Sequence, residues 1–386
     1  MAATCWLRPG RLDVVAARLV ITFDDNDTMS ETTLLPVIGL NIARPWQVGR
    51  VLFHPAGAAV GLIEAARAGS ENDALQPEEQ SQFLQASTRL NRCVVAEVSV
   101  SRTGSVAVAE QLVESALAVL RLVQRMANKS WLVAFQGFGL PGRVNTASYD
   151  FINLTGGRMK PVGVPEVGFR AVGAIQGGAT LGDGLHRAWA NDQVYRFIHE
   201  ALARAEAGRT PLQARALLAI ELLSQAWLSD QPDVRLLTAA MALEVLLAES
   251  SDQEKKARLA RRVSYLACGA PNIGDCCPGD RRAACPFLTL PLRARGKPGP
   301  ELERLIRHAR AGTVPGCRRF LDVLEIYEGR NTIVHEGRLR STIFEPRPDT
   351  RFIEQAVLKP TLTWFSEHLE AELTELDTEI AQVSST

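Results

Sequence analysis

The sequence has no long hydrophobic run and no excess of charge of either sign. No stretch reaches the about 18 consecutive apolar residues that a membrane-spanning helix needs, so we expect no membrane partner. Its 43 Lys and Arg balance 43 Asp and Glu. Nucleic-acid-binding domains usually have a basic excess, so any RNA path here must be a local patch. Residues 255–262 and 293–297 are basic clusters, although solvated faces are the commoner explanation for such clusters.

Two further absences concern targeting and disulfides. The first ten residues have no long apolar core and no small-residue cleavage site, so we expect no secretory signal and a cytoplasmic protein. The seven cysteines are an odd number, and five of them lie between Cys268 and Cys317. Without an export signal, these thiols are expected to be reduced or to bind metal rather than to form disulfides.

The order of the patterns predicts an α+β fold with two domains. Residues 11–60 contain short β-rich runs separated by turn residues, and residues 137–184 are rich in glycine. After Gly184 the apolar residues recur at helical spacing. We predict an N-terminal mixed β-rich domain at 1–185, which would recognise an unknown activating ligand or protein. An all-α helical bundle would follow at 186–386.

Several helices of the second part are predicted from their starting residues. Thr210 and Pro211 suit the cap and first position of a helix that runs to about Leu228. Asp233 is expected to cap the next helix. Along residues 318–328, four apolar residues recur at helical spacing and predict one buried face: Phe320, Leu321, Leu324 and Tyr327.

A polar motif, Arg330-Asn331-x3-His335, continues from this last run. On an unbroken helix Asn331 and His335 share a face, whereas Arg330 is rotated about 140° from His335, at about 100° per residue. The Arg330 side chain must therefore curl back, or meet the His335 of a second copy. Ile333 and Val334 are expected to pack inward.

The motif resembles the catalytic signature of the HEPN superfamily. With the helical segments 236–247 and 261–266 and with Tyr327, it is similar to the Apea-like branch over roughly the last 40% of the chain. The resemblance implies a HEPN-like helical bundle and metal-independent RNA cleavage. It also implies a homodimer or higher homo-oligomer whose motifs face a shared cleft, and a toxin-like role such as anti-phage defence.

The residue types suit cleavage of RNA. The His335 imidazole can transfer a proton near neutral pH, and the permanently charged Arg330 can stabilise phosphoryl oxygens in the transition state. Asn331 can orient either the histidine or the phosphate. A 2′-hydroxyl nucleophile restricts the reaction to RNA and produces a 2′,3′-cyclic phosphate. Glu244 resembles an acidic residue of this branch, and it either pairs with Arg330 or is exposed.

An insert at about 268–300 contains the pattern Cys268-x7-Cys276-Cys277-x7-Cys285. Four cysteine thiolates can bind one structural zinc ion tetrahedrally. Neither spacing is Cys-x2-Cys, and adjacent cysteines rarely bind the same ion, so Cys317 or His308 can replace one ligand. A loop with incidental thiols explains the same pattern. We expect no cofactor for catalysis.

Two other functions compete with the ribonuclease. One is a non-catalytic HEPN module that dimerises or binds RNA or nucleotide. The other is a zinc-stapled scaffold for protein interaction. A purely structural explanation of the motif is that Arg330 pairs with a helix carboxylate and His335 caps the helix end. The intact Arg-Asn-x3-His pattern favours the enzyme.

Overall fold

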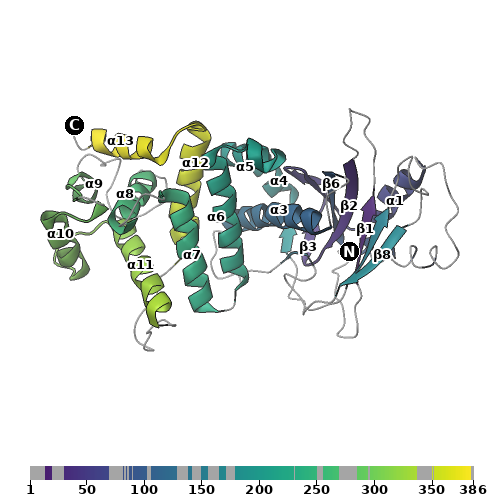
Figure 1. The fold of residues 1–386 in the computed structure, drawn as a ribbon, viewed down its shortest axis with the longest axis horizontal. Helices are drawn as coiled ribbons and strands as arrows, with labels where there is room; N and C mark the ends of the chain where they lie inside the picture. Colours follow the sequence, from purple (N-terminus) through teal and green to yellow (C-terminus); the bar gives the residue numbers. More distant parts are fainter. Residues whose placement is uncertain are drawn as a thin grey trace. The chain divides into compact units, whose positions relative to one another are not determined.

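The protein is mixed α+β and divides into two compact units (Figure 1). Unit 1 comprises Met1–Asp192 with Leu202–Arg204, and unit 2 comprises Gln193–Ala201 with Ala205–Thr386. The computed structural model describes residues 14–19, 30–68, 81, 84, 87–88, 90–101, 106–127, 138–140, 149–154, 165–170, 179–229, 231–249, 255–268, 285–293, 296–336, 350 and 352–383.

Unit 1 is built on a seven-stranded sheet in the order β4-β5-β6-β2-β1-β7-β8. Its strands are β1 (Val14–Leu19), β2 (Ser30–Val37), β4 (Trp46–Val48), β5 (Val51–His54), β6 (Val94–Ser101), β7 (Tyr149–Leu154) and β8 (Pro165–Arg170). Neighbours are antiparallel except β1 and β7, which are parallel. A parallel pair is added by β3 (Leu40–Ile42) and β9 (Ala179–Leu181). Short strands are therefore present within residues 11–60, as the β-rich runs there predicted.

The long helix α3 (Val106–Ala127) contacts β2, β5 and β6 (Figure 1). Its apolar residues from Val113 to Val123 are almost all buried there. The buried Arg121 donates from Nε and Nη2 to the Phe138 carbonyl, at 2.9 and 2.7 Å, and pairs with Glu114 at 3.2 Å. These bonds offset the cost of burying the guanidinium. The shorter helices of unit 1 are α1 (Ala59–Ala68) and α4 (Asp183–Ala190). The helix α5 (Gln193–Ala203) belongs to unit 2 up to Ala201 and to unit 1 from Leu202.

One glycine of unit 1 is required by its position. Gly49, in the β4–β5 turn, has φ +60°, a conformation that side chains disfavour. A Cβ added there would lie 2.4 Å from Leu202 Cβ at the end of α5. Only glycine permits this close approach.

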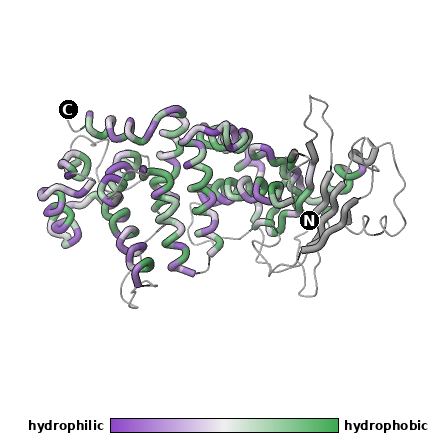
Figure 2. Tube along the Cα trace, in the orientation of Figure 1, coloured by the Kyte–Doolittle hydropathy of each residue, from purple (hydrophilic) through white to green (hydrophobic). Residues whose placement is uncertain are grey.

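Unit 2 is helical. Its elements are α6 (Pro211–Leu228), α7 (Pro232–Leu247), α8 (Lys255–Ala267), α9 (Pro286–Thr289), α10 (Pro300–Arg310), α11 (Arg318–Glu336), the π-helix η4 (Ile353–Leu358), α12 (Lys359–Glu367) and α13 (Leu373–Val383). Figure 2 shows mostly hydrophobic residues along α6 and α7, which pack together. The helix α11 packs against α7 and α8.

The structure tests two predicted helix starts. The Thr210–Pro211 start of α6 is confirmed: Thr210 Oγ1 accepts from Gln213 N at 3.3 Å, and Gln213 Oε1 accepts from Thr210 N at 3.1 Å. The predicted Asp233 cap is wrong, because Pro232 already begins α7 and Gln231 occupies the cap position. Asp233 lies within the first turn, where a carboxylate interacts favourably with the positive end of the helix dipole.

The basic cluster on α8 is divided between the core and the surface: Arg262 is buried, Arg258 and Arg261 are half-buried, and Lys256 is exposed. Arg262 is fully buried, and its guanidinium donates to both Asp377 oxygens, at 2.8 and 2.7 Å, and to the Leu247 carbonyl at 2.6 Å. Arg261 donates to the Leu290 carbonyl. Burial lowers the pKa of Arg261 to about 10, so it stays charged at neutral pH. Arg262 is therefore closed to a surface ligand.

The α+β class and the helical C-terminal part agree with the sequence-based prediction. Part of the predicted insert is ordered helix, since α9 lies within it and Leu292 forms a β-bridge with Pro298. Residues 269–284 lie outside the described part of the chain. None of the helices in the described segments is both long and apolar enough to cross a membrane.

Candidate functional site

The Arg-Asn-x3-His motif lies on the last two turns of α11, which is helical without interruption from Arg318 to Glu336. The predicted apolar face is confirmed, since Phe320, Leu321, Leu324 and Tyr327 are all buried. The helix therefore continues through the motif, and the rotation of about 140° between Arg330 and His335 applies.

Arg330 faces its own chain's α7. Its Nε lies 3.3 Å from Glu244 Oε1, and its Nη1 donates to Asn331 Oδ1 at 3.3 Å. The Nε–H is buried but poorly aligned for a hydrogen bond, so the pair is mainly a contact of opposite charges. The side chains are half-buried, with 31% of Arg330 and 20% of Glu244 exposed. Of the two alternatives for Glu244, the structure has the pair with Arg330.

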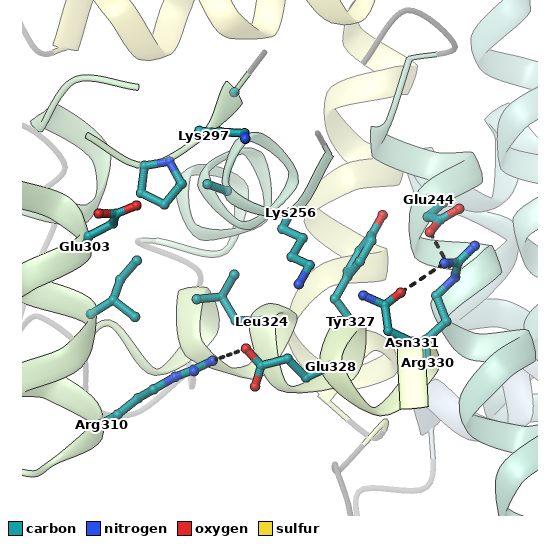
Figure 3. A pocket seen from close by; sticks show the side chains of 14 residues that line it. Glu244, Lys256, Lys297, Glu303, Arg310, Leu324, Tyr327, Glu328, Arg330 and Asn331 are labelled. Atoms are coloured by element: carbon teal, nitrogen blue, oxygen red, sulfur yellow. Dashed lines mark hydrogen bonds and ion pairs between the residues drawn. The ribbon is translucent and has the colours of Figure 1, made fainter. Parts of the chain in front are cut away.

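These three residues line a pocket of about 700 Å³ in unit 2 (Figure 3). The pocket has an apolar floor and a rim of charged side chains from α7, α8, α10, α11 and the segment before α10. Its lining comprises Glu244, Lys256, Ala257, Gly296, Lys297, Pro298, Glu303, Ile306, Arg310, Leu324, Tyr327, Glu328, Arg330 and Asn331.

The charged groups on this rim are partly paired. Arg310 Nη2 lies 2.9 Å from Glu328 Oε1, and Glu303 is 4.0 Å from Arg293. In Figure 3 the Lys256 side chain points between Leu324 and Tyr327. It has no ion-pair partner among the described residues. Arg330 with Glu244, and Arg310 with Glu328, flank it on either side (Figure 3).

His335, the fourth predicted catalytic residue, is exposed one turn beyond Asn331. Within the described part of the chain, no hydrogen bond joins it to Arg330 or Asn331. The prediction that Val334 packs inward is wrong, because Val334 is 56% exposed. Burial along α11 ends at Gly329 and exposure rises over the last turn. The end of α11 therefore presents an imidazole beside an apolar side chain.

The structure describes two of the four predicted zinc ligands. Cys285 is buried at the start of α9, and Cys268 is half-buried directly after α8. Cys276 and Cys277 lie outside the described residues. Within the described segments, no three His, Cys, Asp or Glu side chains are grouped as metal ligands. Cys317 donates to Ser264 Oγ at 3.5 Å in the core. The zinc site stays a prediction.

Part of the pocket was not predicted from the sequence. Lys256 and Lys297 belong to the two basic clusters, so a weak signal existed for them. Arg310 and Glu328 gave no signal, because their pairing joins residues on different helices.

No protein-family model matches the chain, and neither the curated proteins nor the solved structures include a significant match. The function must therefore be inferred from the chemistry of this site.

Proposed function

We propose that the protein is a metal-independent RNA endonuclease of the HEPN type, with a HEPN-like helical bundle in unit 2. The observation that carries the proposal is the arrangement on α11. Arg330, held between Glu244 and Asn331, faces a pocket lined by both basic and acidic side chains, and the same helix exposes His335 one turn further on.

Each residue has one role in the reaction. The 2′-hydroxyl oxygen attacks the neighbouring phosphorus while the bond to the 5′-oxygen breaks, which leaves a 2′,3′-cyclic phosphate and a 5′-hydroxyl. His335 takes the proton from the 2′-hydroxyl as the base, and the leaving 5′-oxygen takes a proton from water. Arg330 stabilises the charge on the phosphoryl oxygens. Asn331 and Glu244 hold the guanidinium in position.

Two copies of the chain would complete this site. Arg330 and His335 of one chain diverge by about 140° around the helix, and Arg330 is turned toward Glu244. Apposed α11 ends would bring the Arg330 of one copy near the partner's His335, and the exposed Val334 would be covered in that contact. The proposal therefore includes a homodimer. A toxin-like action and anti-phage defence accompany it from the family resemblance alone, and a cytoplasmic location is proposed from the absence of a recognisable secretory signal.

The decisive experiment measures RNA cleavage by purified full-length variants in EDTA. We expect His335→Ala to reduce the rate by about 10²–10⁴-fold and Arg330→Ala by about 10²–10³-fold. His308→Ala is the matched control, because His308 is an exposed histidine of α10 outside the motif, and its rate should stay at the wild-type level.

Three results would contradict the mechanism: wild-type rates in His335→Ala, arrest of the wild type by EDTA, or cleavage of a substrate that is 2′-deoxy at the cut position. Light scattering tests the dimer separately. A monomer at micromolar concentration with full activity would exclude a composite site.

Metal content separates the enzyme from the zinc-stapled scaffold. If Cys268, Cys276, Cys277 and Cys285 hold zinc, elemental analysis should find about one equivalent per chain, because structural zinc binds very tightly. Less than about a tenth of an equivalent would exclude the site. Zinc without any RNA cleavage would favour the scaffold.

A further inference from the structure

The pocket beside Arg330 extends well beyond the motif. Lys256 comes from α8, Lys297 from the segment before α10, and Arg310 from α10, and all three line the same space as Arg330 and Asn331 (Figure 3). Four cationic side chains from four parts of unit 2 therefore converge on one pocket. Such convergence concentrates positive potential in a partly enclosed space and attracts an anion.

Because several charged side chains on the rim pair with one another, the positive potential of the pocket is centred on Lys256. Glu244 is opposite Arg330 and Glu328 is opposite Arg310, so two of the three carboxylates are already matched by a cation. The third, Glu303, is 4.0 Å from Arg293. Lys256 has no carboxylate partner in the described part of the chain, and it lies between the two matched pairs (Figure 3).

The shape and chemistry of the pocket indicate the class of ligand. Its volume of about 700 Å³ is within the range of about 300–1,000 Å³ typical of small-molecule sites. Pro298, Ile306 and Leu324 provide an apolar floor. A ligand must therefore combine an anionic group with a sizeable apolar or planar part.

From these features we propose that the pocket binds a nucleoside phosphate, with Lys256 and Lys297 on the phosphate and the nucleoside over the apolar floor. The inference rests on the proposed function and deepens it: in an RNA substrate, this nucleotide would be the neighbour of the scissile phosphate at Arg330. Lys256 is then a substrate-positioning residue outside the motif.

The test measures binding, so that it does not depend on cleavage. A labelled single-stranded RNA of about ten nucleotides, within the about 4–16 nucleotides that an OB-fold covers on a single strand, is titrated by fluorescence anisotropy against chains carrying His335→Ala. Lys256→Glu is compared with Arg307→Glu, which makes the same charge change at an exposed position of α10 outside the pocket. Thermal melting verifies that both variants fold.

We expect Lys256→Glu to weaken RNA binding about ten-fold or more, because a charged hydrogen bond is lost and a repulsive charge is gained. Arg307→Glu should bind within about two-fold of the parent, as surface charges far from a ligand are screened. In Lys256→Ala, the slope of log K against log salt should fall by about 0.7, the value for one phosphate contact on a single strand.

A second arm identifies the source of the nucleoside phosphate. An equimolar mixture of the four nucleoside 5′-monophosphates is titrated by calorimetry into the parent and Lys256→Glu. Lys256-dependent RNA binding supports the substrate strand as the source. Lys256-dependent binding of the monophosphates, with RNA binding unchanged, supports a free nucleotide. If Lys256→Glu changes neither, or if Arg307→Glu has the same effect, the pocket assignment is wrong.

The two proposals fail separately. If RNA binding depends on Lys256 but the wild-type chain does not cleave RNA, the pocket assignment is supported and the ribonuclease proposal is wrong. If cleavage depends on His335 but RNA affinity does not depend on Lys256, the ribonuclease proposal is supported and the pocket assignment is wrong.

Discussion

Two arginines of the helical unit bind carboxylates in contrasting ways. Arg262 is fully buried and makes two short, parallel bonds to Asp377 and a third to a backbone carbonyl. Arg330 is 31% exposed and meets Glu244 with one 3.3 Å contact that is poorly aligned. The Arg262 pair joins α8 to α13 in the manner of bidentate structural pairs. The Arg330 pair, by contrast, leaves guanidinium N–H groups available to a ligand.

The difference shows how the surroundings of an arginine decide its role. At Arg262 each of the three guanidinium nitrogens donates to a protein oxygen, and the side chain is fully buried. At Arg330 the pocket supplies space, and the partner carboxylate orients the side chain without enclosing it. A phosphate can therefore approach Arg330, whereas access to Arg262 would require unfolding of the helical unit.

The largest expected effect is on stability. Arg262→Ala should lower the free energy of unfolding by about 3 kcal/mol, because Asp377 loses its partner and the Leu247 carbonyl loses its donor. Arg330→Ala should lower it by less than about 1 kcal/mol, as for other partly exposed ion pairs. Urea unfolding followed by circular dichroism measures both. Equal losses in the two variants would mean that the motif is structural.

A smaller effect is expected at Glu244. If Glu244 only orients Arg330, Glu244→Gln should reduce kcat about ten-fold, equivalent to about 1.4 kcal/mol, while KM for RNA stays the same. Steady-state kinetics on a short RNA separates the two constants. Glu303→Gln, on the opposite side of the pocket (Figure 3), is the control with unchanged kcat. A raised KM at constant kcat would instead make Glu244 part of substrate binding.

The smallest effect concerns Asp322, which is buried near the start of α11 and pairs with Arg318 and Arg319. Burial raises the pKa of Asp322 above its ordinary 3.8, against the opposing effect of the two arginines. A raised pKa in the folded state means that stability is greatest below the unfolded pKa and is lost as pH rises through the folded value. The ionised carboxylate is therefore slightly unfavourable at neutral pH.

Asp322→Asn should accordingly be more stable than the wild type at pH 7, by no more than about 1 kcal/mol. The gain should shrink toward pH 4, where the carboxyl group of the wild type becomes protonated. Urea unfolding at the two pH values measures the difference. A gain that grows as the pH falls would show that the two arginine pairs outweigh burial.

Local chemistry in the sequence predicted much of the fold. The cap at Thr210 and Pro211 and the buried face of α11 need only residues within a few turns of one another, and both are confirmed. The Asp233 cap failed for an equally local reason: two starting signals compete, and Pro232 takes the first helical position.

The site depends on distant pairs, and these were harder to predict. Arg262 meets Asp377 across 115 residues, so a count of neighbouring charges placed Arg262 on the surface when it lies in the core. Glu244 was a candidate partner of Arg330 because of a family resemblance, not because of spacing. Lys256 is exposed and Arg262 is buried because they lie on different faces of α8. The packing of α11 and α13 against α8 decides which face is buried.

Because α11 runs unbroken through the motif, a chain lacking Arg330 and a chain lacking His335 would carry complementary defects. In a two-fold dimer with shared sites, a mixed pair would contain one site with both native residues and one with neither. Random pairing of the two forms would restore roughly a quarter of the wild-type sites. Under the proposed toxin-like function, two alleles that are each harmless alone would become toxic when expressed in one cell, which a growth assay can detect.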